Sequence, residues 1–175
     1  FRNLIKIKLV PNLYFQEIKQ GYRKIYKKFK SQSQGQLQGI LLISEVIDEV
    51  ISQPINIFGD KKKIKFDEFI FLKKMLDFFV SQGVKDKIII RFHPYESCSK
   101  YNYILAKYKK RLKIIKSKRV DLLKNLADSR LVVGVDSMAL IAAYLCKKRV
   151  ISLQSIINKR AVFPSFKRIK RLQKI

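Results

Sequence analysis

Several residue types are scarce in this chain of 175 residues, and each shortage excludes a class of protein. Six glycines and four prolines beside a hydrophobic fraction of 47% exclude a disordered or low-complexity chain. The longest apolar run, Met138 to Cys146, is far shorter than the roughly 20 residues that cross a bilayer as a helix. The two cysteines, Cys98 and Cys146, lack CxxC or Cys/His metal spacing, and so few thiols fit a reducing compartment better than a disulfide framework. The sequence therefore predicts a folded domain without a membrane span.

Common enzyme signatures are also missing. The chain contains no GxxxxGK followed by Ser or Thr, and no GxGxxG, GxSxG or HExxH. These absences disfavour P-loop phosphoryl transfer, typical dinucleotide binding, α/β-hydrolase chemistry and zinc proteolysis. Because His93 is the single histidine and no DxD-type acidic cluster lies near it, we expect no metal site.

Acidic residues are few as well. Thirteen Asp and Glu against 39 Lys and Arg leave a net charge of +26. Such a field attracts anions, so nucleic acid, an anionic membrane surface and phosphorylated or acidic sugars are all candidate partners.

The middle of the chain alternates short apolar runs with amphipathic stretches. This alternation predicts βαβ units and a parallel sheet. Strands are predicted at 39–45, 87–92, 112–115, 131–134 and 150–153, with helices at about 66–82, 99–111, 121–127 and 136–146. The expected fold class is α/β, a Rossmann-like parallel sheet flanked by helices.

Basic segments flank this predicted domain of residues 39–155. Residues 1–38 hold a basic helix and a polar linker, and residues 156–175 form a basic, amphipathic tail. Because the chain opens on Phe1, we expect it to be part of a longer protein, with residues 1–38 as the remnant of a missing N-terminal domain.

Two sequence positions fit the ligand-binding edge of a parallel sheet, where the carboxyl ends of the strands meet. His93-Pro94 directly follows the predicted strand 87–92, and Asp136-Ser137 opens the helix after strand 131–134. A helix N-terminus favours phosphate, and a histidine there can donate to a phosphate oxygen or protonate a leaving group. The alternatives are that Asp136 or Ser137 only caps the helix and that His93 makes a structural hydrogen bond.

Two further residues are candidates at this edge. Gly134 permits a close approach of backbone to ligand. Glu45, just after the first strand, can act as a base or hold a sugar hydroxyl, or can be a solvated loop acid.

The phrases IIIRFHPYES at 88–97 and LADSRLVVGVDSMALIAAYLCKKRVISLQ at 126–154 together resemble the C-terminal donor-binding domain of GT-B-fold bacterial glycosyltransferases. Those enzymes build capsule and lipopolysaccharide, and related HP and Ser motifs occur in sialyltransferases, polysialyltransferases and Kdo transferases. The resemblance implies that His93 and Ser137 contact the donor phosphate, with Pro94, Gly134, Asp136 and Met138 beside them.

The resemblance implies an enzyme that transfers a sugar from a CMP- or UDP-linked donor to a glycan or lipid-linked glycan. The lack of a DxD-type acidic cluster near the phosphate site predicts that the enzyme is metal-independent. His93 and Glu45 are its catalytic candidates. Because the acceptor and general base of GT-B enzymes usually come from the other domain, we expect this chain alone to bind donor without transferring it. We expect a cytoplasmic protein whose basic ends contact the anionic inner membrane, with no specific nucleic acid. The alternatives are a basic nucleic-acid-binding module and a nucleotide-sugar epimerase-like protein.

Overall fold

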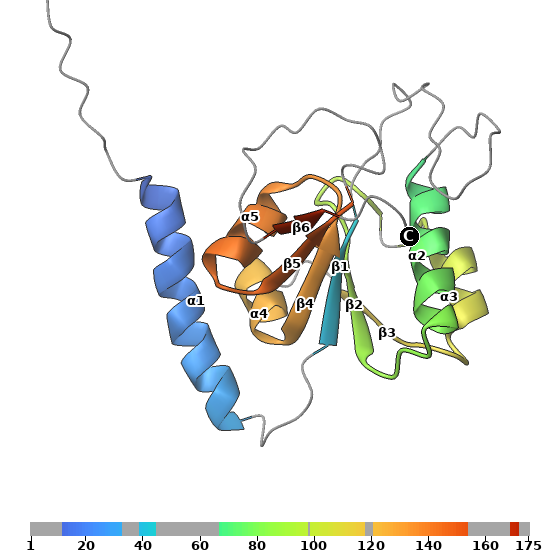
Figure 1. Ribbon diagram of the computed structural model, residues 1–175, viewed down its shortest axis with the longest axis horizontal. Helices are drawn as coiled ribbons and strands as arrows, with labels where there is room; N and C mark the ends of the chain where they lie inside the picture. Colours follow the sequence, from blue (N-terminus) through green and yellow to red (C-terminus); the bar gives the residue numbers. More distant parts are fainter. Residues whose placement is uncertain are drawn as a thin grey trace, which may run out of the picture.

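A computed structural model describes residues 12–32, 39–44, 67–97, 99–117, 121–153 and 169–171 (Figure 1). The helices are α1 (Leu13–Gln32), α2 (Glu68–Ser81), α3 (Asn102–Tyr108), α4 (Leu122–Ala127) and α5 (Met138–Leu145). The strands are β1 (Gly39–Ile43), β2 (Lys87–Arg91), β3 (Lys113–Ser117), β4 (Ser129–Gly134), β5 (Arg149–Ser152) and β6 (Ile169–Arg171). Within these ranges, every helix is too short or too polar to span a bilayer.

The strands form one sheet in the order β3-β2-β1-β4-β5-β6, and each neighbouring pair is parallel. This order is that of a Rossmann-like doubly wound sheet, which confirms the predicted fold class. Five of the strands are those expected from the sequence. The sixth, β6, lies in the segment 156–175 that was expected to be a tail, and its Ile169 pairs with Val150 of β5.

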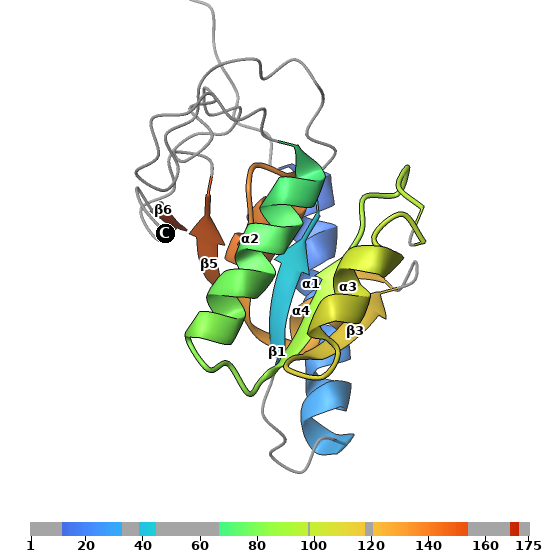
Figure 2. The same cartoon turned by 90° about the vertical axis from the view of Figure 1, so that its right-hand side faces the viewer.

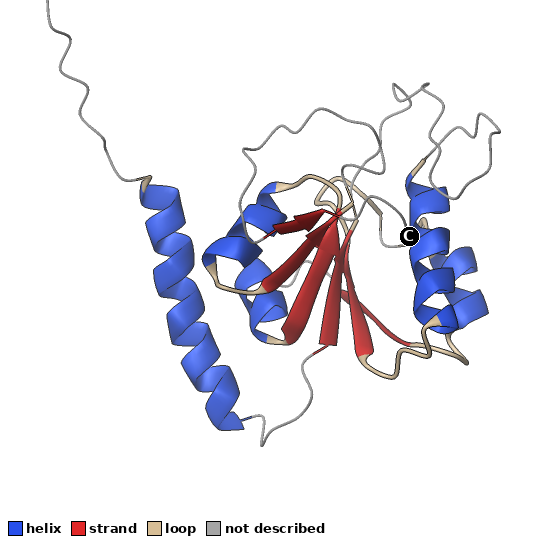
Figure 3. Ribbon diagram, viewed as in Figure 1, coloured by secondary structure: helices blue, strands red, loops and turns tan. Residues whose placement is uncertain are grey.

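Helices cover both faces of the sheet (Figures 2 and 3). On one face, α2 and α3 enclose a core that includes Leu76 and Leu105, with Ile88 and Ile90 from β2. On the other face, α1, α4 and α5 enclose a second core with Leu41 of β1. All five residues of β1 are buried, as expected for a central strand with helices on both sides.

Helix α2 ends where the Gly83 signal predicts and begins two residues after the predicted start. The Asp67 side chain accepts a hydrogen bond from the Ile70 amide at 2.8 Å, so it caps the helix. After the helix, Gly83 adopts a φ of +59°, a left-handed conformation that costs glycine little and favours a helix stop. The helix predicted at 66–82 is therefore confirmed.

Helix α1 packs onto the domain. Its Ile18 and Tyr22 are buried in the core shared with α4 and α5, and its Tyr22 and Tyr26 rings stack with centroids 5.4 Å apart. The Lys148 ammonium lies 5.5 and 5.3 Å from these two ring centroids, within the range of a cation–π contact. The described part of segment 1–38 thus shares a core with the sheet, and its origin as the remnant of another domain stays a prediction.

Burial acts on the ionisable groups under α1. It lowers the pKa of Lys148 to about 8, which the nearby Cys146 and Asp128 partly oppose. Burial also raises the pKa of the Cys146 thiol to about 11, so this free cysteine is an unreactive core thiol at neutral pH. Cys98 lies outside the described residues.

Candidate functional site

The candidate site lies at the carboxyl edge of the sheet, around the end of β1. The strand order reverses between β1 and β4, and such a switch point is where open α/β sheets bind ligands. Ser44 follows β1, His93 follows its neighbour β2, and Ser137 follows its other neighbour β4. With neighbouring strands about 4.8 Å apart, β2 and β4 are separated by roughly 10 Å, so their loops face one another across β1.

Glu96 ties the loop after β2 to the end of β1. One of its carboxylate oxygens, Oε2, accepts hydrogen bonds from the Ser44 hydroxyl at 2.8 Å and from the His93 amide at 2.9 Å. The other, Oε1, accepts from the Tyr101 hydroxyl and lies 3.9 Å from the Lys100 ammonium. Only 2% of the Glu96 side chain is exposed. Because this buried carboxylate binds the His93 amide directly, it fixes where His93 leaves the sheet.

An aromatic wall encloses the Glu96 carboxylate. Tyr101 is fully buried and stacks on Phe92 with centroids 5.2 Å apart. Burial, followed by the hydrogen bond to Glu96, holds the pKa of Tyr101 far above its usual range. The phenol therefore keeps its proton and remains a hydrogen-bond donor to the carboxylate.

The His93 ring uses one of its nitrogens within the loop. Its Nδ1 accepts a hydrogen bond from the Tyr95 amide at 3.4 Å. A neutral imidazole that accepts at Nδ1 carries its proton on Nε2, so Nε2 is a donor. The ring is half-buried, and its centroid lies 5.4 Å from that of Tyr95. The structure thus contains the structural hydrogen bond offered as the alternative, and leaves a donor on the other side of the ring.

Ser137 occupies the N-cap position of α5, but its side chain does not cap the helix. Its carbonyl oxygen accepts from the Leu140 amide at 3.0 Å, as an N-cap carbonyl does. Among the described residues, its hydroxyl oxygen is the one buried side-chain polar atom without a hydrogen-bond partner. An unsatisfied buried polar group costs about 1–3 kcal/mol, so this hydroxyl calls for a functional explanation.

The helix behind Ser137 adds further donors. The first amides of an α-helix have no partner within the helix, and the helix dipole places partial positive charge at this end. Together with the Ser137 hydroxyl, the N-terminus of α5 therefore offers several N–H and O–H donors to an anion.

The other predicted site residues fall around this centre. Gly134 is buried, and a Cβ there would lie 3.2 Å from Ile43 Cβ and 3.4 Å from Leu140 Cδ2. The glycine therefore leaves room for the Ile43 side chain of β1 and the Leu140 side chain of α5, and its predicted approach to a ligand stays a prediction. Asp136 is half-buried between β4 and α5, and Met138, the first residue of the helix, is 41% exposed.

The two remaining predicted residues are Pro94 and Glu45. Pro94 is exposed in the turn after His93, and Glu45 lies outside the described residues. Among the described residues, no group of three or more His, Cys, Asp or Glu side chains is placed to hold a metal ion.

The sequence analysis did not identify Glu96, Ser44 or Tyr101. One signal was available: an acid three residues after the histidine, in HPYE, is spaced to accept a hydrogen bond from a backbone amide of its own turn. The Ser44 contact joins residues 52 apart in the chain, and no local pattern predicts such a pair.

No protein-family model matches the chain, and no curated protein matches its sequence. Among solved structures, it is similar to Thermosulfurimonas dismutans KpsC, a beta Kdo 2,7 transferase, with 12% identity and a TM-score of 0.45 over 93% of this chain and 50% of that one. A KpsC beta Kdo 2,4 transferase from the same organism gives 12% identity and a TM-score of 0.41 over 86% and 48%. POFUT1 in complex with GDP gives 14% identity and a TM-score of 0.37 over 71% and 43%. The chain thus spans about half the length of these structures, and at such identities and scores none of them assigns a substrate or a site residue to it.

Proposed function

We propose that this chain is the donor-binding half of a GT-B-type glycosyltransferase and that it holds the phosphates of a nucleotide-sugar between His93 and Ser137. The observation that carries the proposal is the buried, unpartnered Ser137 hydroxyl at the N-terminus of α5. It lies on the same sheet edge as His93, at the switch point of the strand order. The resemblance of the HP and Ser phrases to surface-polysaccharide glycosyltransferases supports the same two residues.

The chemistry follows from the charge that develops during sugar transfer. The bond between the anomeric carbon and a phosphate oxygen breaks, and the departing phosphate gains negative charge. The α5 amides, the Ser137 hydroxyl and the His93 Nε2–H donate hydrogen bonds toward that charge, and preorganised donors of this kind stabilise a transition state strongly. Because Nδ1 accepts from the Tyr95 amide, the ring in this geometry is neutral, and His93 acts on the leaving group as a hydrogen-bond donor; acting as a general acid would require a proton on Nδ1 and loss of that contact. Transfer to an acceptor, and any role of Glu45 as a base, belong to the proposal for the longer protein.

A nucleotide titration tests the proposal. We expect one of CMP, UDP or GDP to stabilise the chain saturably in a thermal-shift assay, while inorganic phosphate has little effect. EDTA is expected to leave the shift unchanged, because the proposed donors need no metal. His93→Gln should weaken binding about tenfold, since one hydrogen bond to a charged group contributes about 1.5 kcal/mol or more.

Asp86→Asn provides a control at the opposite edge of the sheet, where Asp86 pairs with Arg130 at 2.7 Å. Equal, weak shifts by all three nucleotides that His93→Gln leaves untouched would show that the +26 charge merely collects anions, and would refute the donor site.

The proposal places the protein at an anionic membrane surface on the cytoplasmic side, and α1 supports this part of it. The solvent-exposed surface of α1 carries one acid, Glu17, and a set of cations. These cations are Lys19, Arg23, Lys24, Lys27, Lys28 and Lys30. A cluster of this size near a surface of anionic lipid contributes about 1 kcal/mol per residue.

Sedimentation with lipid vesicles measures this contact. We expect binding to vesicles containing phosphatidylglycerol and little binding to phosphatidylcholine vesicles. The double variant Lys24→Glu/Lys27→Glu should lower vesicle binding by roughly tenfold or more, whereas Lys109→Glu/Lys110→Glu, the same charge change beside α3, should lower it less. Preferential binding of a particular nucleic-acid sequence over the vesicles would instead favour the nucleic-acid module.

A further inference from the structure

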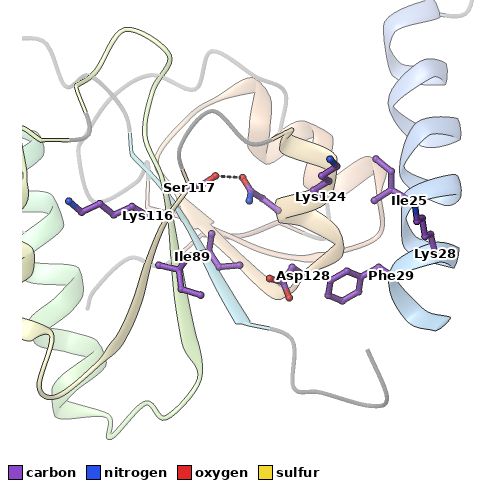
Figure 4. A pocket seen from close by; sticks show the side chains of 10 residues that line it. Ile25, Lys28, Phe29, Ile89, Lys116, Ser117, Lys124 and Asp128 are labelled. Carbon is purple, nitrogen blue, oxygen red and sulfur yellow. Dashed lines mark hydrogen bonds between the residues drawn. The ribbon is translucent and has the colours of Figure 1, made fainter. Parts of the chain in front are cut away.

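A cavity of about 440 Å³ lies on the face of the sheet opposite α2 and α3 (Figure 4), and Ser137 is not among the residues that line it. Its volume falls in the usual range of small-molecule sites, about 300–1,000 Å³. The walls come from the C-terminal half of α1, from α4, and from strands β2 and β3. The cavity therefore lies between helix α1 and the β3 edge of the sheet.

Aliphatic and aromatic groups form most of its surface. Ile25 and Phe29 project from α1 toward α4, and Ile89 lies across from them on β2 (Figure 4). Ile115 of the edge strand β3 also lines the cavity and is 47% exposed. An isoleucine so exposed on a sheet face leaves apolar area in contact with water, and covering it with an apolar ligand group is favourable.

The Ser117 hydroxyl, the Asn125 carbonyl oxygen and the Asp128 carboxylate of the lining are engaged with the protein. The Ser117 hydroxyl donates to Asn125 Oδ1 at 2.7 Å, and the Arg91 guanidinium donates to the same oxygen at 3.0 Å. Asp128 pairs with Lys87 at 2.6 Å, which offsets its negative charge. These oxygens are therefore poorly available as hydrogen-bond partners for a ligand rich in hydroxyl groups.

Cationic groups remain at the mouth. Lys28 on α1 and Lys124 on α4 line the cavity and are exposed. Lys116 contributes only its stem, because its ammonium donates to Asn102 of α3 and its side chain points away from the other residues drawn in Figure 4. With Asp128 paired, the excess charge at this mouth is positive.

We infer that this cavity binds a single-chain anionic amphiphile, with the hydrocarbon chain along Ile25, Phe29, Ile89 and Ile115 and the anionic head beside Lys28 and Lys124. The apolar walls favour an aliphatic body, and the two exposed lysines favour a negative head group. Both a fatty carboxylate and a single-chain lipid phosphate have this chemistry. The inference does not depend on the proposed donor site.

Methyl NMR of the full chain with labelled isoleucine tests the inference, using decyl phosphate, decanoate, decyl maltoside and inorganic phosphate below their micelle concentrations. We expect saturable shifts of Ile25, Ile89 and Ile115 with the two amphiphilic anions, and none with phosphate alone. The methyl signal of Ile104, which is buried on the opposite face of the sheet, should not shift. A tighter Kd for decyl phosphate than for decanoate would identify a lipid phosphate as the source, and the reverse order a fatty acid.

Charge variants distinguish binding in the cavity from nonspecific attraction of anions by the net positive charge of the protein. Lys28→Glu/Lys124→Glu should weaken decyl phosphate binding at least tenfold, while Lys109→Glu/Lys110→Glu changes it less than twofold. Ile115→Glu, at an exposed position that leaves the fold intact, should abolish binding.

Three results would overturn the inference. Equal loss in both lysine double variants would assign binding to net charge, and equal affinity for decyl maltoside would remove the need for an anion. A ligand-free dimer that Ile115→Glu dissociates would show that a second copy of the chain covers this face.

Discussion

Glu96→Ala is expected to destabilise this protein by about 3–5 kcal/mol, because each buried donor left without an acceptor costs about 1–3 kcal/mol. The substitution leaves three donors without an acceptor: the Ser44 hydroxyl, the His93 amide and the Tyr101 phenol. It also opens a gap behind the aromatic wall of Phe92 and Tyr101. Urea-induced unfolding measures the loss directly.

Two further variants make the result interpretable. Glu96→Gln keeps the shape and one carbonyl oxygen, which can still accept from Ser44 and His93, while its amide can donate to a rotated Tyr101 hydroxyl. We therefore expect a smaller loss, about 1–2 kcal/mol. Glu17→Ala removes an exposed acid, so it controls for the change in net charge. A loss for Glu96→Ala within 1 kcal/mol of that control would contradict the central role of this carboxylate.

The same variants separate stability from positioning. If Glu96 orients His93, then Glu96→Gln, assayed where it is fully folded, should bind the preferred nucleotide more weakly than wild type and lose little more when His93→Gln is added. Additive losses would mean that the two residues act independently.

The strands and the fold class were predictable because their signals are strong and local. Runs such as Ile88 to Ile90 and Leu131 to Val133 are apolar on both faces, and a parallel sheet covered by helices requires that pattern. Strand β6 gives no such signal, because two of its three residues, Lys170 and Arg171, are cationic. The strand joins the sheet by backbone pairing with β5, which a local sequence pattern does not predict.

Helix ends were less predictable than helices. The helix expected at 99–111 spans only Asn102–Tyr108, since the Ser97 hydroxyl oxygen accepts from the Ser99 amide at 3.4 Å in the preceding turn and Leu112 begins the return to β3. Serine side chains compete with helical backbone bonding in this way. The helix expected at 136–146 begins at Met138, after the N-cap Ser137.

The candidate site was half predictable for a related reason. His93 and Ser137 follow their strands directly, so the topology alone brings them to one edge. The contacts of Glu96 with Ser44 and of α1 with Lys148 depend instead on tertiary packing between segments distant in sequence. Periodicity in the sequence carries no information on either contact.

Ser137→Ala should affect stability and binding in opposite directions. In the free protein the hydroxyl is buried without a partner and makes no capping bond, so its removal should stabilise the fold by up to about 1 kcal/mol. If the hydroxyl donates to a donor phosphate, the same variant should bind the preferred nucleotide about 10- to 100-fold more weakly, because a hydrogen bond to a charged group contributes about 1.5–3 kcal/mol.

Ser152→Ala is the matched control for stability. The Ser152 hydroxyl is also buried at the carboxyl edge of the sheet, but it donates to the Val135 carbonyl oxygen at 2.7 Å, so its removal should destabilise the fold by about 1 kcal/mol. If Ser137→Ala destabilises as Ser152→Ala does, the Ser137 hydroxyl has a partner in solution and is not held for a ligand. If it stabilises the fold without changing nucleotide affinity, the hydroxyl is unsatisfied but does not contact the phosphate. A gain in stability together with a loss of affinity would show that the unpartnered Ser137 hydroxyl destabilises the free protein and that a bound phosphate supplies its missing partner. This result is expected of a preorganised anion site.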